Sequence, residues 1–124
     1  MEISALRQRV RDLDFRRRQL IDEALRPLPM VVGYLFQMRR RCGRAGCRCT
    51  KGRLHVSWYL SRRLAGKTQL SYLGRLIPEG LAPQVRRYRD VQRALAAIRK
   101  IDREISGLLN RIRDDRLSSL EQSR

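Results

Sequence analysis

Residues 54–76, LHVSWYLSRRLAGKTQLSYLGRL, contain the pattern that decides the fold. The segment 54–63 reads as a strand and contains β-branched and aromatic residues, which favour extended backbone. In 68–76, Thr68, Leu70 and Tyr72 alternate with Gln69, Ser71 and Leu73, the two-residue period of a strand. Residues 64–67, LAGK, separate the two segments and include the glycine that tight turns require. The sequence therefore predicts a β-hairpin.

A further strand is predicted upstream of the hairpin. Residues 30–38, MVVGYLFQM, have the same strand-like composition, and Gly33 within them indicates a bulge or a close approach of two backbones. Residues 39–53, RRRCGRAGCRCTKGR, form a loop rich in glycine, arginine and cysteine. The hairpin is thus expected either alone or as part of a three-stranded antiparallel meander.

Helices are predicted on both sides of these strands. An apolar stripe along residues 4–25 is interrupted by Arg17 and ends before Pro27. A second helix runs from about Pro83 to at least Leu117, with apolar steps of three and four residues that are typical of a coiled coil. The first stripe consists of Ile3, Leu6, Val10, Leu13 and Leu20, and the second of Val85, Tyr88, Val91, Leu95, Ile98, Ile101, Ile105, Leu108 and Ile112.

These elements predict an α+β fold in one domain. The N-terminal helix (1–26) and the long C-terminal helix (79–124) flank a basic β-unit (27–78) that carries the cysteine loop. We expect the two helices to pack antiparallel. The second apolar stripe is longer than the first, so the surplus is expected to bind a second copy and form a homodimer through the helices. Alternatively, the surplus folds back on the sheet.

Charge is unevenly distributed along the chain. The 124 residues include 29 Lys or Arg and 12 Asp or Glu, a net charge of +17. Residues 26–75 contain twelve of the bases and no acid, whereas residues 1–25 and 76–124 have mixed charge. A segment with such a field attracts a polyanion through counterion release. The sequence therefore predicts a nucleic-acid-binding protein.

Other classes fit less well. No apolar run is long enough to span a bilayer, and the start of the chain is charged, so we expect no membrane partner and a cytoplasmic, nucleoid-associated protein. Residues 66–68, GKT, lie in a hairpin turn and lack the remaining glycine of a phosphate loop. The one histidine has no carboxylate near it in sequence, so we expect no enzymatic activity.

The cysteine loop predicts a metal site. Cys42, Cys47, Cys49 and His55 have the spacing C-x4-C-x-C-x5-H, and three thiolates with one imidazole form a known structural Zn²⁺ site. Such an ion would stabilise a small β-unit. The alternatives are thiols without metal on a basic loop and a redox switch.

Candidate nucleic-acid contacts surround the loop and the hairpin. A two-stranded ribbon fits the major groove, where Arg bonds guanine and Thr contacts phosphate. Trp58, Tyr59 and Tyr72 lie among these bases, where they either stack on unpaired bases or form the core of the sheet. The predicted contacts are Arg39, Arg40, Arg41, Arg44, Arg48, Lys51, Arg53, Arg62, Arg63, Lys67, Thr68, Arg75, Arg86 and Arg87.

Several motifs occur together in a known pattern. Residues 41–49 (RCGRAGCRC), His55, residues 61–63 (SRR), residues 66–68 (GKT) and residues 86–88 (RRY) resemble an uncharacterised family of small basic bacterial proteins. The chain departs from that pattern just after the histidine, where Val-Ser-Trp replaces Gly-Pro-Tyr. Members of the family often accompany mobile genetic elements.

The family has no assigned activity, so the resemblance supports the zinc and DNA predictions only by showing that these motifs recur together. With the charge of the chain, we predict a DNA-binding accessory factor of a transposase or recombinase. Two alternatives remain open at this point. One is an RNA-binding or ribonucleoprotein component, and the other is a coiled-coil module that binds a protein partner while its arginines keep it in solution.

Overall fold

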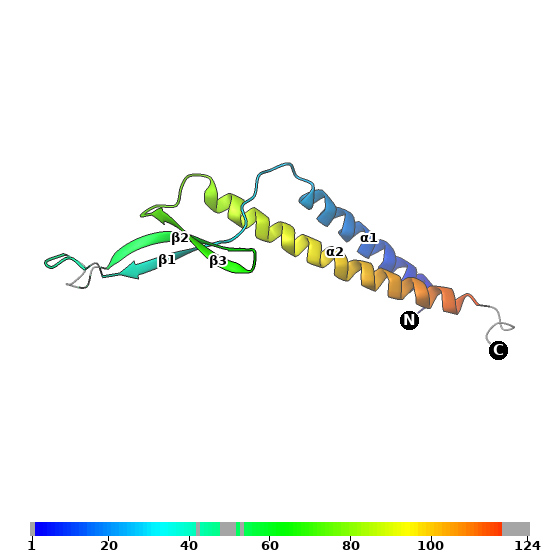
Figure 1. The fold of residues 1–124 in the computed structure, drawn as a ribbon. Helices are drawn as coiled ribbons and strands as arrows, with labels where there is room; N and C mark the ends of the chain where they lie inside the picture. The colour runs from blue at the N-terminus through cyan, green and yellow to red at the C-terminus, as the bar shows by residue number, and fades with distance from the viewer. Residues whose placement is uncertain (1, 42, 48–51, 53, 118–124) are drawn as a thin grey trace. The chain divides into compact units, whose positions relative to one another are not determined.

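The computed structural model describes residues 2–41, 43–47, 52 and 54–117. The elements follow in the order α1 (Ile3–Ala24), β1 (Tyr34–Arg40), β2 (His55–Leu64), β3 (Lys67–Gly74) and α2 (Leu81–Asp115) (Figure 1). The predicted α+β fold, with one helix before and one after an antiparallel meander in the sequence, is confirmed.

The chain divides into two compact units. Met1–Pro27 and Val91–Arg124 form the helical unit, and Leu28–Asp90 forms the sheet unit. The sheet unit therefore contains all three strands and the first turns of α2, and the helical unit contains α1 and the rest of α2.

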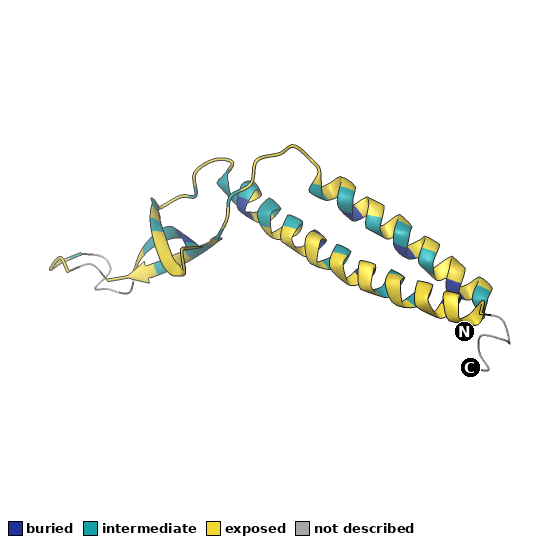
Figure 2. Ribbon diagram, turned by 45° about the vertical axis from the view of Figure 1, so that its right-hand side comes forward, coloured by how far each residue is buried: buried dark blue, intermediate teal, exposed yellow. Residues whose placement is uncertain are grey.

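The helical unit is an antiparallel pair of helices. Leu6, Leu13 and Leu20 recur every seven residues along α1, and all three are buried. Leu13 and Leu20 form a core cluster with Ala94 and Ile101 of α2. Figure 2 shows the buried positions of α1 along the side that faces α2. A seven-residue repeat keeps one side of each helix against its neighbour, as in a coiled coil.

Two details of this packing differ from the sequence pattern. We expected Leu95 in the stripe of α2, but Ala94 is buried there at 3% exposure and Leu95 is 39% exposed. The steps from Ala94 to Ile98 and Ile101 alternate four and three residues, so Ala94 keeps the heptad phase that Leu95 breaks. Arg17, which interrupts the stripe of α1, pairs its Nε with Asp102 Oδ1 at 2.7 Å.

The sheet unit has the strand order β1-β2-β3, with both neighbouring pairs antiparallel. The sequence predicted that the first strand begins at residue 30, but it begins at Tyr34. The reason is that Val31 N–H donates to Gln84 O of α2 at 3.0 Å, so its hydrogen bond goes to the helix instead of a strand. Arg87 likewise donates to the carbonyl of Pro29.

Gly33, just before β1, lies close to the backbone of β2. Its φ is +127°, and a Cβ placed on it would lie 2.4 Å from Ser61 O. The close approach of backbones expected at this glycine is confirmed. Ser61 and its neighbour Leu60 are both buried, as is Val85 in the first turns of α2. The apolar core of the sheet unit is therefore small.

Candidate nucleic-acid interface

One face of the sheet has a row of aromatic rings. Directly paired residues of neighbouring strands point to the same face, and Phe36 pairs with Tyr59, which pairs with Tyr72. The ring centroids of Phe36 and Tyr59 are 5.7 Å apart, and those of Tyr59 and Tyr72 are 5.5 Å apart. Tyr34 extends the row, with its centroid 6.1 Å from that of Phe36. We call these four residues the aromatic row.

The ends of the aromatic row face solvent. Tyr34 is 55% exposed and Tyr72 is 65% exposed, whereas Phe36 and Tyr59 between them are half-buried. Of the three aromatics singled out from the sequence, Trp58 is also half-buried, on the opposite face of the sheet. Tyr72 is thus a surface residue, and Tyr59 takes part in both the core and the surface.

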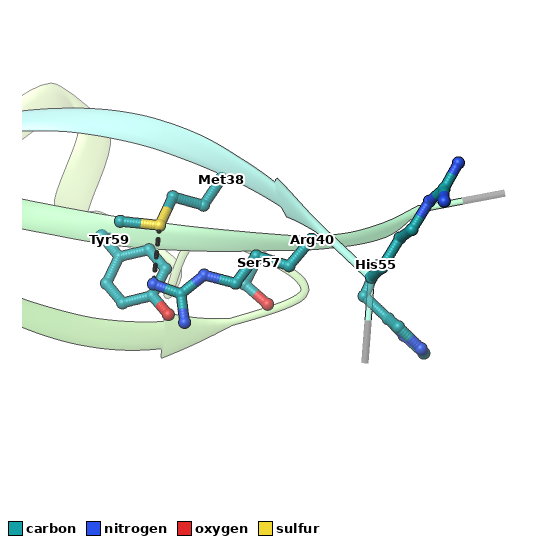
Figure 3. A pocket seen from close by; sticks show the side chains of 6 residues that line it. Met38, Arg40, His55, Ser57 and Tyr59 are labelled. Carbon is teal, nitrogen blue, oxygen red and sulfur yellow. Dashed lines mark hydrogen bonds between the residues drawn. The ribbon is translucent and has the colours of Figure 1, made fainter. Parts of the chain in front are cut away.

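A cation lies over the middle of the row. The guanidinium carbon of Arg40 is 5.9 Å from the Tyr59 ring centroid, a cation–π distance, and Arg40 Nη2 donates to Met38 Sδ at 3.0 Å. Figure 3 shows this guanidinium beside the Tyr59 ring and the sulfur of Met38. The residues form one side of an open cavity of about 320 Å³, which Arg41, His55 and Ser57 complete.

A second basic cavity lies at the Tyr34 end of the row. It has a volume of about 540 Å³ and contains three arginines, Arg62 and Arg63 from the end of β2 and Arg89 from α2. The Arg62 Nε is buried and has no hydrogen-bond partner among the described residues. The remaining lining residues are Val32, Gly33, Tyr34, Ser61, Thr68 and Tyr88. Main-chain alternation places Arg63 and Thr68 on the face of the aromatic row, and Arg62 on the other face.

A third cavity lies at the Tyr72 end of the row. Tyr72, Arg75 and His55 line it, together with Leu54, Val56 and Ser57, and its volume is about 530 Å³. Each part of the aromatic row therefore has at least one arginine in a cavity next to it.

The structure places the other predicted contacts in different surroundings. Arg39 and Lys67 lie on the sheet face opposite the aromatic row, and both are exposed. Arg41, Arg44 and Arg86 are exposed, and the half-buried Arg87 bonds the backbone of its own unit. Arg48, Lys51 and Arg53 lie outside the described residues. Sequence reasoning missed Tyr34 and Phe36, whose spacing of two in a strand was the available signal.

Two of the four predicted zinc ligands lie together. Cys47 Sγ is 3.1 Å from His55 Nε2, although eight residues separate them in sequence. Cys42 and Cys49 lie outside the described residues. In the described part of the chain, no three potential metal ligands come together.

Neither helix has, among its described residues, an apolar stretch sufficient to cross a bilayer.

The fold and this surface define a small α+β protein in which a helical pair accompanies a basic, aromatic-faced sheet. The chain belongs to the family described as "Domain of unknown function (DUF6788)", whose pattern matches residues 6–82. The match begins within α1, spans the complete sheet and ends in the first turn of α2. No curated protein and no solved structure matches the chain. This agrees with the sequence analysis, in which the motifs resembled an uncharacterised family.

Proposed function

We propose that this chain is a non-enzymatic nucleic-acid-binding protein that contacts its ligand through the sheet unit. The proposal rests on the distribution of charge between the two compact units. The sheet unit has fourteen Lys or Arg and two Asp or Glu, a formal charge of +12. The helical unit has fifteen Lys or Arg and ten Asp or Glu, a formal charge of +5.

The acids of the helical unit have local partners. Arg17 pairs with Asp102, and Arg9 pairs with Glu104 at 3.4 Å, so part of the positive charge of this unit is neutralised internally. The sheet unit has only Glu79 and Asp90 to offset fourteen bases. A phosphate backbone laid against the sheet unit would release its condensed counterions, which favours binding without any base contact.

DNA is the favoured ligand, and an accessory role beside a transposase or recombinase of a mobile element is the favoured context. The β2–β3 hairpin is a two-stranded ribbon with Arg63, Lys67 and Thr68 at its tip, a shape that fits the major groove. The context rests on the sequence resemblance alone. RNA binding is the alternative within the same chemistry, and competition between duplex DNA and structured RNA at fixed salt separates the two.

The test removes charge from the hairpin tip. Arg63→Gln with Lys67→Gln changes two exposed residues of the sheet unit. Arg62 is left intact because it is half-buried and its Nε is enclosed, whereas Arg63 and Lys67 are exposed. The matched control is Arg99→Gln with Lys100→Gln, which removes the same charge from exposed positions of the helical unit.

We expect the hairpin variant to bind duplex DNA more weakly than the control. Each phosphate contact contributes about 0.9 to the slope of log K against log salt, so losing two contacts lowers the slope by about 1.8. The control variant keeps the wild-type slope. Equal losses of affinity in both variants would mean that binding depends on the net charge of the chain and not on contacts of the sheet unit.

A structural zinc ion is a second proposal, which the Cys47–His55 contact favours. A thiolate and an imidazole 3.1 Å apart are close enough to ligate one ion together. Zinc held there would join the loop after β1 to the start of β2. Metal analysis of protein purified without added metal is expected to give about one zinc per chain, and less after His55→Ala. Folded wild-type protein with zinc content near zero would contradict the proposal.

We also propose that the helices form a homodimer. Phe15 on α1 and Leu109 on α2 are large apolar side chains that remain more than half exposed in the single chain. A second copy would cover them and add to the small core of each helical unit. Sedimentation equilibrium should give twice the chain mass, and a monomer at micromolar concentration would contradict it.

A further inference from the structure

The aromatic row exposes rings in the most basic part of the molecule. Tyr34 and Tyr72 are more than half exposed, yet they belong to the unit of charge +12. Large exposed rings beside uncompensated cations are typical of surfaces that bind a ligand with flat apolar faces and negative charge. We propose that the aromatic row binds unpaired bases, so that the ligand class of this sheet face is single-stranded nucleic acid. This inference rests on the proposed function, nucleic-acid binding by the sheet unit. It assigns unpaired bases to the face of the rings, whereas the hairpin tip is proposed to contact duplex DNA.

The geometry of the row fits successive bases. The four rings form a continuous path across all three strands, with neighbouring centroids between 5.5 and 6.1 Å apart. Phe36 and Tyr59 are held by contacts on both sides, so they form a rigid centre, while Tyr34 and Tyr72 present free ring surface at the ends. Rings fixed by a sheet need little ordering when a base stacks on them.

Arginines accompany the rings at every part of the row. Arg40 lies over Tyr59, Arg63 shares a cavity with Tyr34, and Arg75 shares a cavity with Tyr72. A single strand that crosses the row would therefore place a base near each ring while its phosphates meet these cations. Arg40 can also move from the ring to a phosphate, since its other described contact is a weak bond to Met38.

A duplex fits this face less well. Its base faces are stacked on one another, and its grooves present polar edges that are read by hydrogen-bonding side chains. The aromatic row offers ring faces, which only an unpaired base can use. An acidic peptide would meet the charge requirement, but it would leave the stacking surface of four rings unused.

The experiment compares ring variants on three probes of equal length. Tyr72→Ala and Tyr34→Ala remove the exposed ends of the row and leave the half-buried centre intact. The control is Leu25→Ala, which removes a large apolar side chain of similar exposure (71%) at the end of α1 in the helical unit. Fluorescence anisotropy measures binding of the full chain to a labelled 12-nucleotide dT strand, to its abasic analogue and to a duplex of equal length.

We expect each tyrosine variant to bind the dT strand about tenfold more weakly, because stacking contributes about 1–3 kcal/mol per base and 1.4 kcal/mol corresponds to tenfold. Tyr72→Phe keeps the ring and should bind as the wild type does. The salt slope should stay unchanged, since no phosphate contact is lost. Leu25→Ala should leave all affinities unchanged, and the wild type should bind the abasic strand more weakly than dT.

Two results would overturn the inference while leaving the proposed function in place. One is equal affinity of the wild type for the dT strand and the abasic analogue. The other is a loss in Tyr72→Ala no larger than that in Leu25→Ala, with duplex binding retained. Absence of binding to every probe would overturn the proposed function as well. A uridine strand added to the series distinguishes RNA from DNA as the source of the unpaired bases.

Discussion

Replacing Gly33 with alanine tests how the sheet unit is held together. The new Cβ would lie 2.4 Å from Ser61 O and 2.9 Å from Arg62 Cγ. The carbonyl belongs to the backbone of the central strand, so it cannot rotate away as the end of a long side chain does. Alanine is also strained at the φ of +127° that Gly33 adopts. The substitution must therefore move β1 away from β2.

The expected loss of stability comes from two sources. Holding a non-glycine residue in a sparsely populated backbone region costs about 1–3 kcal/mol. Displacing packed neighbours costs about 1–3 kcal/mol more. A unit of about 60 residues has a total stability of about 3–9 kcal/mol, so Gly33→Ala should remove a large part of it.

Gly74→Ala is the control that separates the two sources. Gly74 has a φ of +98°, and a Cβ placed on it meets no atom of the described residues within 4 Å. This variant therefore has the backbone strain without the collision. Its loss should be about half that of Gly33→Ala or less.

Urea unfolding followed by tryptophan fluorescence measures both variants. Trp58 is the single tryptophan and lies in β2, so its signal reports the sheet unit. With a slope near 1 kcal/mol per molar urea, Gly33→Ala should lower the midpoint by about 2 M or more. Equal midpoints for the Gly33 and Gly74 variants would refute the close packing at Gly33.

Two further predictions concern the helical unit. Arg17→Leu removes an exposed ion pair with Asp102, which contributes about 0–1 kcal/mol, and places an apolar side chain in the heptad of α1. The Tm measured by circular dichroism should therefore stay level or rise. A fall of more than about 4 °C would contradict this. Gly107→Ala should stabilise α2 by about 1 kcal/mol, because a Cβ there meets nothing within 4 Å, and a lower helical melting temperature would count against that reasoning.

The main elements of the fold could be predicted from the sequence because they depend on local patterns. The hairpin around Gly66 and the two amphipathic helices follow from composition and from the spacing of apolar residues. The start of β1 could not, since it depends on the hydrogen bond from Val31 to Gln84, a partner far along the chain. Which of Ala94 and Leu95 is buried depends on where α1 places its leucines, as well as on the sequence of α2.

The candidate site was predictable in its charge but not in its shape. The acid-free segment and the Arg63–Thr68 hairpin tip are visible in the sequence. The aromatic row is not, because the contact between Phe36 and Tyr59 arises from strand register across a loop. Register also decides which arginines share the face of the rings. Patterns within one strand contain no information about this pairing.

The most direct test of nucleic-acid binding is a titration of the nuclease-treated full chain. Anisotropy with labelled single-stranded and duplex DNA and with RNA is measured at salt concentrations from 50 to about 200 mM, a range over which phosphate-driven binding changes steeply. We predict saturable binding whose log K falls linearly with log salt, with a slope that indicates several phosphate contacts. A folded sample that binds none of these ligands at 50 mM salt would contradict the proposed function.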